Sequence, residues 1–270
     1  MSKKERLDVL LTERGFFKSR SKAKRSIMAG LVFVDEQKID KAGTKIDLEA
    51  EIRVKGDLHP YVSRGGLKLE KALEVFNIDL SDKLIIDIGA STGGFTDCAL
   101  QNGARKVYAI DVGYNQLAWK LRSDERVVCM EKTNARYLTL EDIGEAGDFG
   151  MTDVSFISLT KILPALKGLL NSSGEIVALI KPQFEAGPEN VGNNGVVKDP
   201  AIHKEVIYKI FNFAKEIGLI PIGLNYSPIT GGKSHNIEYL SYFTLDQKAL
   251  EISNLDQKIE EIIKVAHQDL

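Results

Sequence analysis

Acidic and basic residues that could bind a ligand or move a proton come at, or directly after, short apolar runs. These residues are Asp87 within 84–88, Asp111 after 107–110, Asp153 after 149–152 and Lys181 after 176–180. Apolar runs of this length predict buried strands. The carboxyl ends of parallel strands meet at one edge of a sheet, where ligands bind. We therefore predict a single site at that edge, lined by carboxylates and a lysine.

A glycine-rich turn follows the first of these runs, and a helical pattern begins at Phe95. Glycine lets the backbone approach a ligand, and a helix N-terminus offers free N–H groups, so a strand, turn and helix of this kind cradle nucleotide-like ligands. The dinucleotide fingerprint requires glycine where this chain has Ser91. Asp111, at the tip of the second strand, is placed to accept hydrogen bonds from ribose hydroxyls. The pattern therefore favours S-adenosylmethionine (SAM); a nicotinamide site and a turn without a ligand are the alternatives.

Ten residues are expected to bind SAM, and Asn134 stands where a methyltransferase often contacts the adenine. They are Asp87, Gly89, Ala90, Ser91, Gly93, Gly94, Phe95, Asp111, Val112 and Asn134.

Other motifs predict little. The segment 231–234 resembles the end of a phosphate-binding loop, but position 227, where that motif needs glycine, is Ser. The two cysteines, Cys98 and Cys129, lack metal-binding spacing, as do the four histidines. We expect buried, reduced thiols and no metal site.

Composition limits the class of protein. With 270 residues, 43% of them hydrophobic, the chain can form a small domain and a larger one. No apolar run approaches the roughly 20 residues of a membrane span, and the N-terminus has no apolar signal region, so we expect a cytoplasmic protein. Residues 1–30 hold nine basic and three acidic side chains, although the whole chain has a net charge of −2. This asymmetry predicts an N-terminus that binds a polyanion.

Two short helices and a strand are expected at the N-terminus. Leu7, Leu10 and Leu11 share one helix face, Ser19 is a suitable N-cap for a helix over 20–29, and 31–34 predicts a strand. The order and spacing of this segment resemble an S4 domain, a small fold that binds structured RNA, over about the first 55 residues. The resemblance implies that the exposed basic residues bind RNA, although a solvated basic face is the alternative. These residues are Arg6, Arg20, Lys22, Lys24 and Arg25.

Beyond the N-terminus, strands alternate with helices, which predicts an α/β fold with a parallel sheet covered on both faces. Expected elements are helices over 159–170 and 201–217, a turn at 171–174, a loop over 183–199 that could act as a lid, strands over 219–226 and 237–245, and an exposed amphipathic helix over 255–265. The predicted domains are 1–56, a linker 57–64, a Rossmann-like domain 65–245 and a helical tail 246–270.

From residue 61 onward the pattern resembles the FtsJ-like (RrmJ-type) 2′-O-ribose RNA methyltransferases, which use a Lys-Asp-Lys-Glu tetrad. The matching positions are Lys68, Asp153, Lys181 and Glu238. With the S4-like segment in front, nearly the whole chain resembles the TlyA/haemolysin A family. The resemblance implies a Rossmann-like class I SAM-dependent methyltransferase that modifies cytidine riboses of ribosomal RNA. It also implies ribosomal subunits as partners, no membrane and no metal, and a monomer or weak dimer.

The reaction suits the tetrad, because a ribose hydroxyl must lose its proton as it attacks a methyl group. A lysine has a usual pKa of about 10.4, which burial and a neighbouring cation lower. We expect Lys68 and Lys181, if they lie close together, to have this effect on each other. Asp153 and Glu238 would shift the pKa of the lysines the other way, so we expect them to orient the lysines and the ribose. Lys181 is assigned as the group that removes the proton or stabilises the alkoxide.

Three other functions are alternatives. A membrane-lysing protein is suggested by the family name alone. An RNA-binding ribosome-assembly factor without catalysis is disfavoured by the intact tetrad. Amino-directed base methyltransferases typically have Asn/Asp-Pro-Pro-Tyr/Phe after the fourth strand. This chain has Asp153-Val154-Ser155-Phe156 there, without prolines, which disfavours that alternative.

Overall fold

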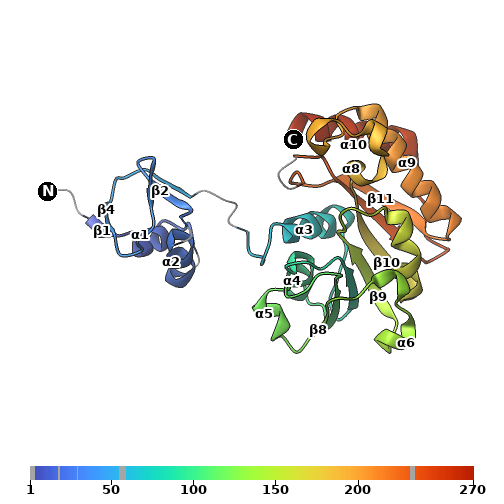
Figure 1. The fold of residues 1–270 in the computed structure, drawn as a ribbon, viewed down its shortest axis with the longest axis horizontal. Coiled ribbons are helices and arrows are strands. Elements are labelled where there is room, and N and C mark those ends of the chain that lie inside the picture. Colours follow the sequence, from blue (N-terminus) through green and yellow to red (C-terminus); the bar gives the residue numbers. More distant parts are fainter. Residues whose placement is uncertain (1–3, 18, 29, 55–58, 232–234) are drawn as a thin grey trace. The chain divides into compact units, whose positions relative to one another are not determined.

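The computed structural model describes residues 4–17, 19–28, 30–54, 59–231 and 235–270. It divides into two compact units, Met1–Pro60 and Tyr61–Leu270 (Figure 1). Part of the predicted linker (57–58) and most of the segment that resembles a phosphate-binding loop (232–234) lie outside the described residues. Among those that are described, no helix is long and apolar enough to cross a membrane.

The N-terminal unit packs two helices against short strands. Its elements are β1 (Lys4–Arg6), α1 (Leu7–Glu13), α2 (Arg20–Met28), β2 (Val32–Val34), β3 (Gln37–Ile39), β4 (Lys45–Asp47) and β5 (Ile52–Val54). The antiparallel strands β3, β2 and β5 form one sheet, and β1 pairs with β4. Leu7, Leu11, Ile27 and Val32 are fully buried between them, so the expected helix faces do form a core.

The larger unit contains a seven-stranded sheet in the order β11-β12-β10-β9-β6-β7-β8. The strands are β6 (Leu84–Ile88), β7 (Lys106–Ile110), β8 (Val127–Met130), β9 (Gly147–Thr152), β10 (Leu170–Ile180), β11 (Ile220–Tyr226) and β12 (Tyr239–Thr244). The sequence predicts a parallel sheet, but β12 runs antiparallel to both of its neighbours. The described part of the loop before β12 contains no helix, and parallel pairing needs a crossover element, usually a helix.

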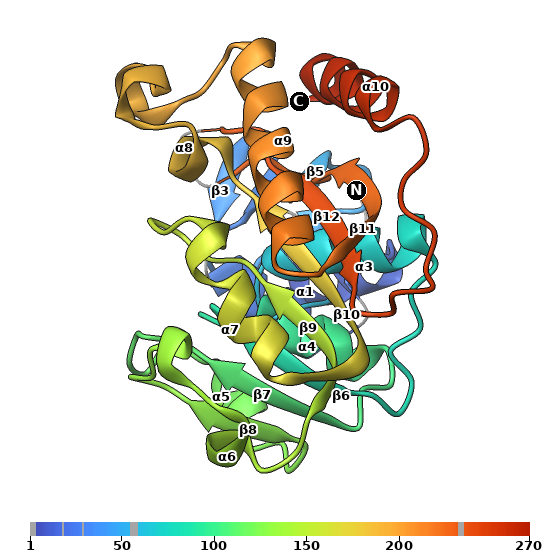
Figure 2. The same ribbon diagram turned by 90° about the vertical axis from the view of Figure 1, so that its right-hand side faces the viewer.

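Helices cover both faces of this sheet (Figures 1 and 2). Helices α3 (Gly65–Phe76), α4 (Gly94–Gln101) and α5 (Trp119–Arg122) pack on one face, and α7 (Leu163–Gly168), α9 (Pro200–Glu216) and α10 (Leu255–Asp269) pack on the other. Successive residues of a strand point to opposite faces, so Ile85 packs with α3 and α4 whereas Ile86 packs with α7 and α9. The remaining short helices are α6 (Leu140–Ile143), α8 (Pro182–Glu185) and the 3-10 turns η1 (Ala135–Tyr137), η2 (Leu159–Lys161), η3 (Pro188–Asn190) and η4 (Asn193–Gly195).

Three expected elements differ from the structure. The helix expected over 159–170 is split into η2 and α7, and the turn expected at 171–174 is an irregular part of β10, where the pairing register shifts between Leu170 and Glu175. The helix expected to be exposed, α10, instead buries Ile259, Ile262 and Ile263 in the core beside α9. The sequence shows the apolar stripe of this helix, but it does not show that α9 and β11 supply the surface that covers the stripe.

Candidate active site

Two adjoining cavities lie at the carboxyl ends of β6, β7, β9 and β10. They have volumes of about 510 and 290 Å³ and share Gly89, Ser91, Asp153 and Ser155 as lining residues. They therefore form one cleft, at the edge of the sheet where such folds bind ligands and within the usual size range of cofactor sites. The predicted residues Ala90, Gly94 and Phe95 line the smaller cavity, and Asp111, Val112 and Asn134 line the larger one.

The glycine turn lies tightly between the segments on either side of it. Gly89 has a φ of +85°, and a Cβ atom there would lie 3.1 Å from the carbonyl oxygen of Asp153. A Cβ atom at Gly94 would lie 2.3 Å from Ser63 Oγ. Glycine is required because a side chain would collide with the segments that carry the site.

Asp111 holds the turn from the tip of β7. Its Oδ2 accepts a hydrogen bond of 2.7 Å from the backbone N–H of Ser91, and Oδ1 accepts one of 2.7 Å from Gly113. Each carboxylate oxygen has two acceptor positions, so Asp111 can also accept hydrogen bonds from ribose hydroxyls. With the glycine turn on one side and Asn134 on the other, these donors and acceptors fit SAM.

Asp87 and Gly93 lie beneath the cleft, and neither is among the described residues that line it. Asp87 is 1% exposed and accepts a hydrogen bond of 2.6 Å from Thr96 Oγ1. Burial raises the pKa of Asp87 to about 7; the hydrogen bond from Thr96 opposes this rise, and the charges of Asp153 and Asp111 add to it. Gly93, at a φ of +95°, lies against Leu121. Both residues shape the turn from below.

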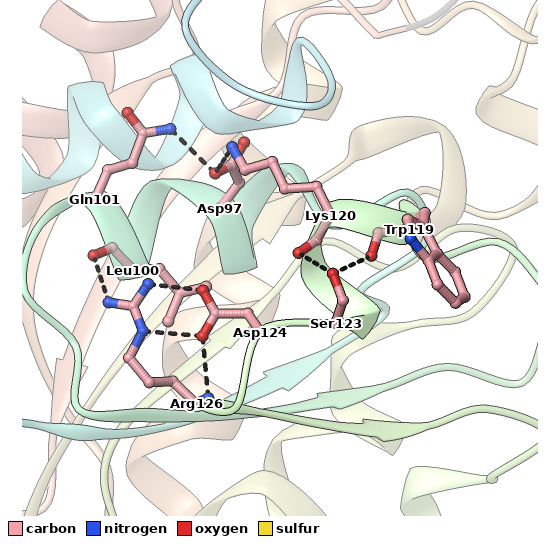
Figure 3. A network of polar contacts seen from close by, with 8 residues as sticks. All are labelled: Asp97, Leu100, Gln101, Trp119, Lys120, Ser123, Asp124 and Arg126. Carbon is pink, nitrogen blue, oxygen red and sulfur yellow. Dashed lines mark hydrogen bonds and ion pairs between the residues drawn. The ribbon is translucent and has the colours of Figure 1, made fainter.

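A buried carboxylate fastens the elements around the turn. Asp97 on α4 accepts hydrogen bonds from Gln101 (3.0 Å) and Lys120 (2.7 Å), as Figure 3 shows, and its other oxygen accepts one of 2.8 Å from the backbone of Val62. In the same view Arg126, paired with Asp124, donates to the carbonyl of Leu100. Helices α4 and α5 and segment 61–65 are thereby held as one support for the cleft.

The four tetrad positions come together at the inner end of the cleft. Lys68 Nζ, on α3, lies 2.6 Å from Glu238 Oε2 and 3.1 Å from Asp153 Oδ2. Lys181 Nζ, directly after β10, lies 2.6 Å from Asp153 Oδ1 and donates a hydrogen bond of 3.2 Å to Ser155 Oγ. Asp153 therefore bridges the two ammonium groups. Lys68, Lys181 and Glu238 are almost fully buried, so solvent screens these charges weakly.

The charges of this cluster shift the pKa of two members. Burial alone would lower the pKa of Lys68, but the carboxylates of Asp153 and Glu238 outweigh burial, and the pKa is raised. Burial would likewise raise the pKa of Asp153, yet the two lysines hold it below its usual range. At Lys68 the effect of the two carboxylates, which the sequence predicts to oppose that of burial and a neighbouring cation, is therefore the larger one.

The predicted RNA-binding residues lie around the first two helices of the N-terminal unit. Arg6 and Arg20 both pair with the buried Asp8, at 3.0 Å each. The Arg6 guanidinium, with Arg20 adding to its effect, holds the pKa of Asp8 below its usual range. Lys24 and Arg25 are exposed on α2, and Lys22 is half-buried. The structure thus groups Arg6 and Arg20 and leaves Lys24 and Arg25 available on the same helix pair.

Sequence reasoning missed several residues of the cleft. Those that line it without having been predicted include Ser63, Arg64, Gln116, Ser155, Phe156 and Thr230. Ser63 and Arg64 stand shortly before Lys68, and Ser155 stands two residues after Asp153, so closeness in sequence to the tetrad was a usable signal. Thr230 precedes Glu238 by a loop and carries no such signal.

Comparison with known proteins gives two family matches. Residues 61–244 match the FtsJ-like methyltransferase family, and residues 5–52 match the S4 domain. Each matched range lies within one of the two compact units of the structure.

Similar proteins span nearly the whole chain. The 16S/23S rRNA (cytidine-2′-O)-methyltransferase TlyA of Mycobacterium tuberculosis is 42% identical over 265 residues, covering 97% of this chain and 98% of that protein. Hemolysin A of Brachyspira hyodysenteriae is 44% identical over 241 residues, covering 89% and 100%. A solved structure named "Putative hemolysin from Streptococcus thermophilus" is 49% identical with a TM-score of 0.76, covering 100% of this chain and 98% of that one.

Proposed function

The chain belongs to the TlyA/haemolysin A family, which joins an S4 domain to an FtsJ-like methyltransferase domain, and from this we propose that it methylates the 2′-hydroxyl of cytidine in ribosomal RNA with SAM as methyl donor. The relatives named as 16S/23S and 23S rRNA (cytidine-2′-O)-methyltransferases support this substrate. We further propose that it acts in the cytoplasm, where its ribosomal RNA substrate would be found, and as a monomer or weak dimer. Among the described residues, those that line the cleft lie within 61–270.

One observation carries the catalytic part of the proposal. Asp153 pairs with both Lys68 and Lys181 at the bottom of the cleft that fits SAM, and Glu238 pairs with Lys68 from the other side. SAM supplies a methyl group on a positively charged sulfur that leaves readily. The protein therefore has to hold the ribose hydroxyl in line with that methyl group and accept its proton.

The two lysines have different surroundings and hence different roles. Lys68 lies between two carboxylates that raise its pKa, so it stays protonated and acts as a fixed positive charge that orients the ribose oxygen. Lys181 lies between one carboxylate and a hydroxyl. We assign Lys181 as the group that takes the proton or stabilises the developing alkoxide, and Asp153 and Glu238 as the groups that orient the lysines. In-line positioning supplies most of the acceleration.

The acceptor atom can be tested directly. An RNA fragment in which the target cytidine is 2′-deoxy removes the proposed acceptor but keeps the base. We expect no transfer of tritiated methyl groups to this RNA, with binding close to that of the ribose form. Methylation of the deoxy fragment would instead identify a base atom as the acceptor and reject the ribose mechanism.

A relative with a hemolysin name raises a second candidate, lysis of membranes. A liposome-leakage assay with purified protein separates the two functions. We expect no leakage at protein concentrations that saturate methyl transfer; strong leakage at low concentration would add membrane activity to the proposed function.

A further inference from the structure

A buried carboxylate outside the tetrad joins the two segments that carry Asp153 and Lys181. Glu185 ends the short helix α8 that follows Lys181, and it is 5% exposed. Its Oε1 accepts a hydrogen bond of 2.7 Å from the backbone N–H of Leu159, and its Oε2 accepts one of 2.6 Å from Ser158 Oγ. The loop 153–159 is therefore fixed at its far end to the helix that starts beside Lys181.

A lysine of α9 completes the surroundings of Glu185. Lys209 Nζ donates to the backbone carbonyl of Glu185 at 2.8 Å and to Oε2 at 3.3 Å. Both oxygens of the carboxylate thus have partners, and its charge has a counterion. A buried charge without partners is strongly disfavoured. Because Glu185 has these partners, its carboxylate can remain buried and anchor the loop 153–159 to α8.

The loop held by Glu185 contains a residue in an unfavourable backbone conformation. Phe156 has a φ of +63°, in the left-handed region that residues other than glycine seldom occupy, and its side chain is 90% exposed. Its ring lies 4.9 Å from the ring of Phe184 on α8. Such a conformation persists where the surroundings impose it, and the bonds to Glu185 lie two and three residues further along the loop.

Ser155 is the member of this loop that contacts the tetrad. Its Oγ accepts the hydrogen bond of 3.2 Å from Lys181 Nζ and lines both cavities of the cleft. Lys68 has two carboxylate partners, whereas Lys181 has one carboxylate and this hydroxyl. The position of Ser155 therefore sets the direction in which the Lys181 ammonium group points.

We propose that Ser155 and Glu185 are positioning residues for methyl transfer: Glu185 fixes the loop 153–159, and the loop holds Ser155 where it orients Lys181 toward the acceptor hydroxyl. This inference rests on the proposed role of Lys181. Ser155 lines the cleft, but the groups expected to hold the nucleoside of SAM are Asp111 and Asn134. Losing the Ser155 hydroxyl or the Glu185 charge should therefore lower the rate of transfer much more than it weakens the binding of SAM and RNA.

The test uses the full chain and four variants of this anchor. In Ser155→Ala the hydroxyl is lost, and in Ser155→Thr it is kept. Glu185→Gln removes the charge at nearly constant shape, and Ser155→Ala with Glu185→Gln combines the two changes. Single-turnover methyl transfer at saturating RNA and SAM gives the rate, and calorimetry and filter binding give the two dissociation constants.

We expect Ser155→Ala and Glu185→Gln each to lower the rate by about 10-fold or more, since small misplacements cost up to about 10²-fold. Ser155→Thr should recover most of the rate. The combined variant should resemble Ser155→Ala alone, because residues that act through one contact are not additive. The proposal would be overturned if the rate of the combined variant fell by the product of the two single fold-losses. An unchanged rate in Ser155→Ala would also overturn it.

A matched control comes from the opposite end of the sheet. Asp148 on β9 also accepts a backbone N–H, from Leu84 at 2.8 Å, and a side-chain donor, Asn171. Asp148→Asn should lower the melting temperature without lowering the rate; an equal loss of rate would make Glu185 merely structural. Lys181→Ala separates this inference from the proposed function: if Lys181→Ala also keeps its rate, the tetrad assignment fails, whereas loss of activity there with a normal Ser155→Ala rejects only the positioning role.

Discussion

Lys68 and Glu238 are 170 positions apart in sequence, yet Lys68 Nζ and Glu238 Oε2 lie 2.6 Å apart in the interior, with side chains only 9% and 3% exposed. This ion pair joins α3, at the start of the larger unit, to the residue just before β12, at its end. Removing either partner leaves the other charge buried, so the pair has a structural role in addition to the catalytic role that we propose for it.

The two roles can be separated by substitution. Glu238→Ala should destabilise the fold by about 3–5 kcal/mol, because it leaves the Lys68 ammonium short of a partner in a buried position. Replacing both residues, as Lys68→Met with Glu238→Leu, should recover most of that stability while methyl transfer stays low. Urea unfolding and a transfer assay measure the two effects. A double variant with normal turnover would show that the pair is structural only.

If Asp111 binds the ribose of SAM, as we expect, removing its carboxylate should weaken the binding of SAM. Asp111→Ala loses charge-assisted hydrogen bonds and also frees the N–H of Ser91, so SAM binding should weaken by about 1.5–3 kcal/mol. Calorimetry measures this. Asn115, whose side chain is exposed on the same loop, provides the control Asn115→Ala, with little change expected. Equal SAM affinity in Asp111→Ala and the unaltered protein would remove Asp111 from the site.

The buried Asp87 predicts a pH dependence of stability. Burial raises its pKa from 3.8 to about 7, so between these values the folded protein binds a proton that the unfolded chain releases. Stability from this group is therefore present at low pH and is lost as the pH rises through about 7, by on the order of 4 kcal/mol. In Asp87→Asn this part of the slope should disappear. The difference between the two unfolding free energies, measured in urea from pH 5 to 8, should change with pH; a constant difference would refute the raised pKa.

Much of this arrangement could be predicted from the sequence, and the reasons are physical. The strand pattern placed Asp111, Asp153 and Lys181 at one edge, because parallel strands bring their carboxyl ends together. The pattern could not place Glu238, because its position depends on β12 inserting antiparallel between β10 and β11. Only the family resemblance brought Glu238 into the site.

The burial of Glu185 is an example of a feature that sequence patterns cannot predict. In the sequence it follows Lys181 in a loop rich in glycine, asparagine and proline, where acids are ordinarily solvated. Its burial depends on hydrogen bonds from Ser158 and Leu159, which lie at the start of η2 after β9, and from Lys209 on α9. Contacts that need three separate segments cannot be read from the spacing within one of them.

Because the N-terminal unit is basic, we expect the affinity of the protein for RNA to fall as the salt concentration rises. Lys24 and Arg25 are exposed on α2, whereas Arg6 and Arg20 also neutralise Asp8, so the first pair gives a cleaner test. Lys24→Ala with Arg25→Ala should weaken RNA binding and reduce the slope of log affinity against log salt by about 1 to 2, since each phosphate contact releases counterions. SAM binding should not change. Filter binding at several salt concentrations decides, and an unaltered slope would place the RNA contact elsewhere.

Lys181 separates proton removal from charge stabilisation. Lys181→Ala should still bind SAM and RNA but turn over very little, because the group assigned to take the proton or stabilise the alkoxide is lost, while Lys68 stays paired with Asp153 and Glu238. Lys181→Arg keeps a positive charge, but an arginine side chain stays protonated in proteins and cannot give up its proton. If Lys181 acts as the base, the arginine variant should be as inactive as the alanine variant; if it stabilises the alkoxide, arginine should recover part of the rate. Single-turnover rates of the three proteins distinguish these outcomes, and normal turnover in Lys181→Ala would exclude both roles.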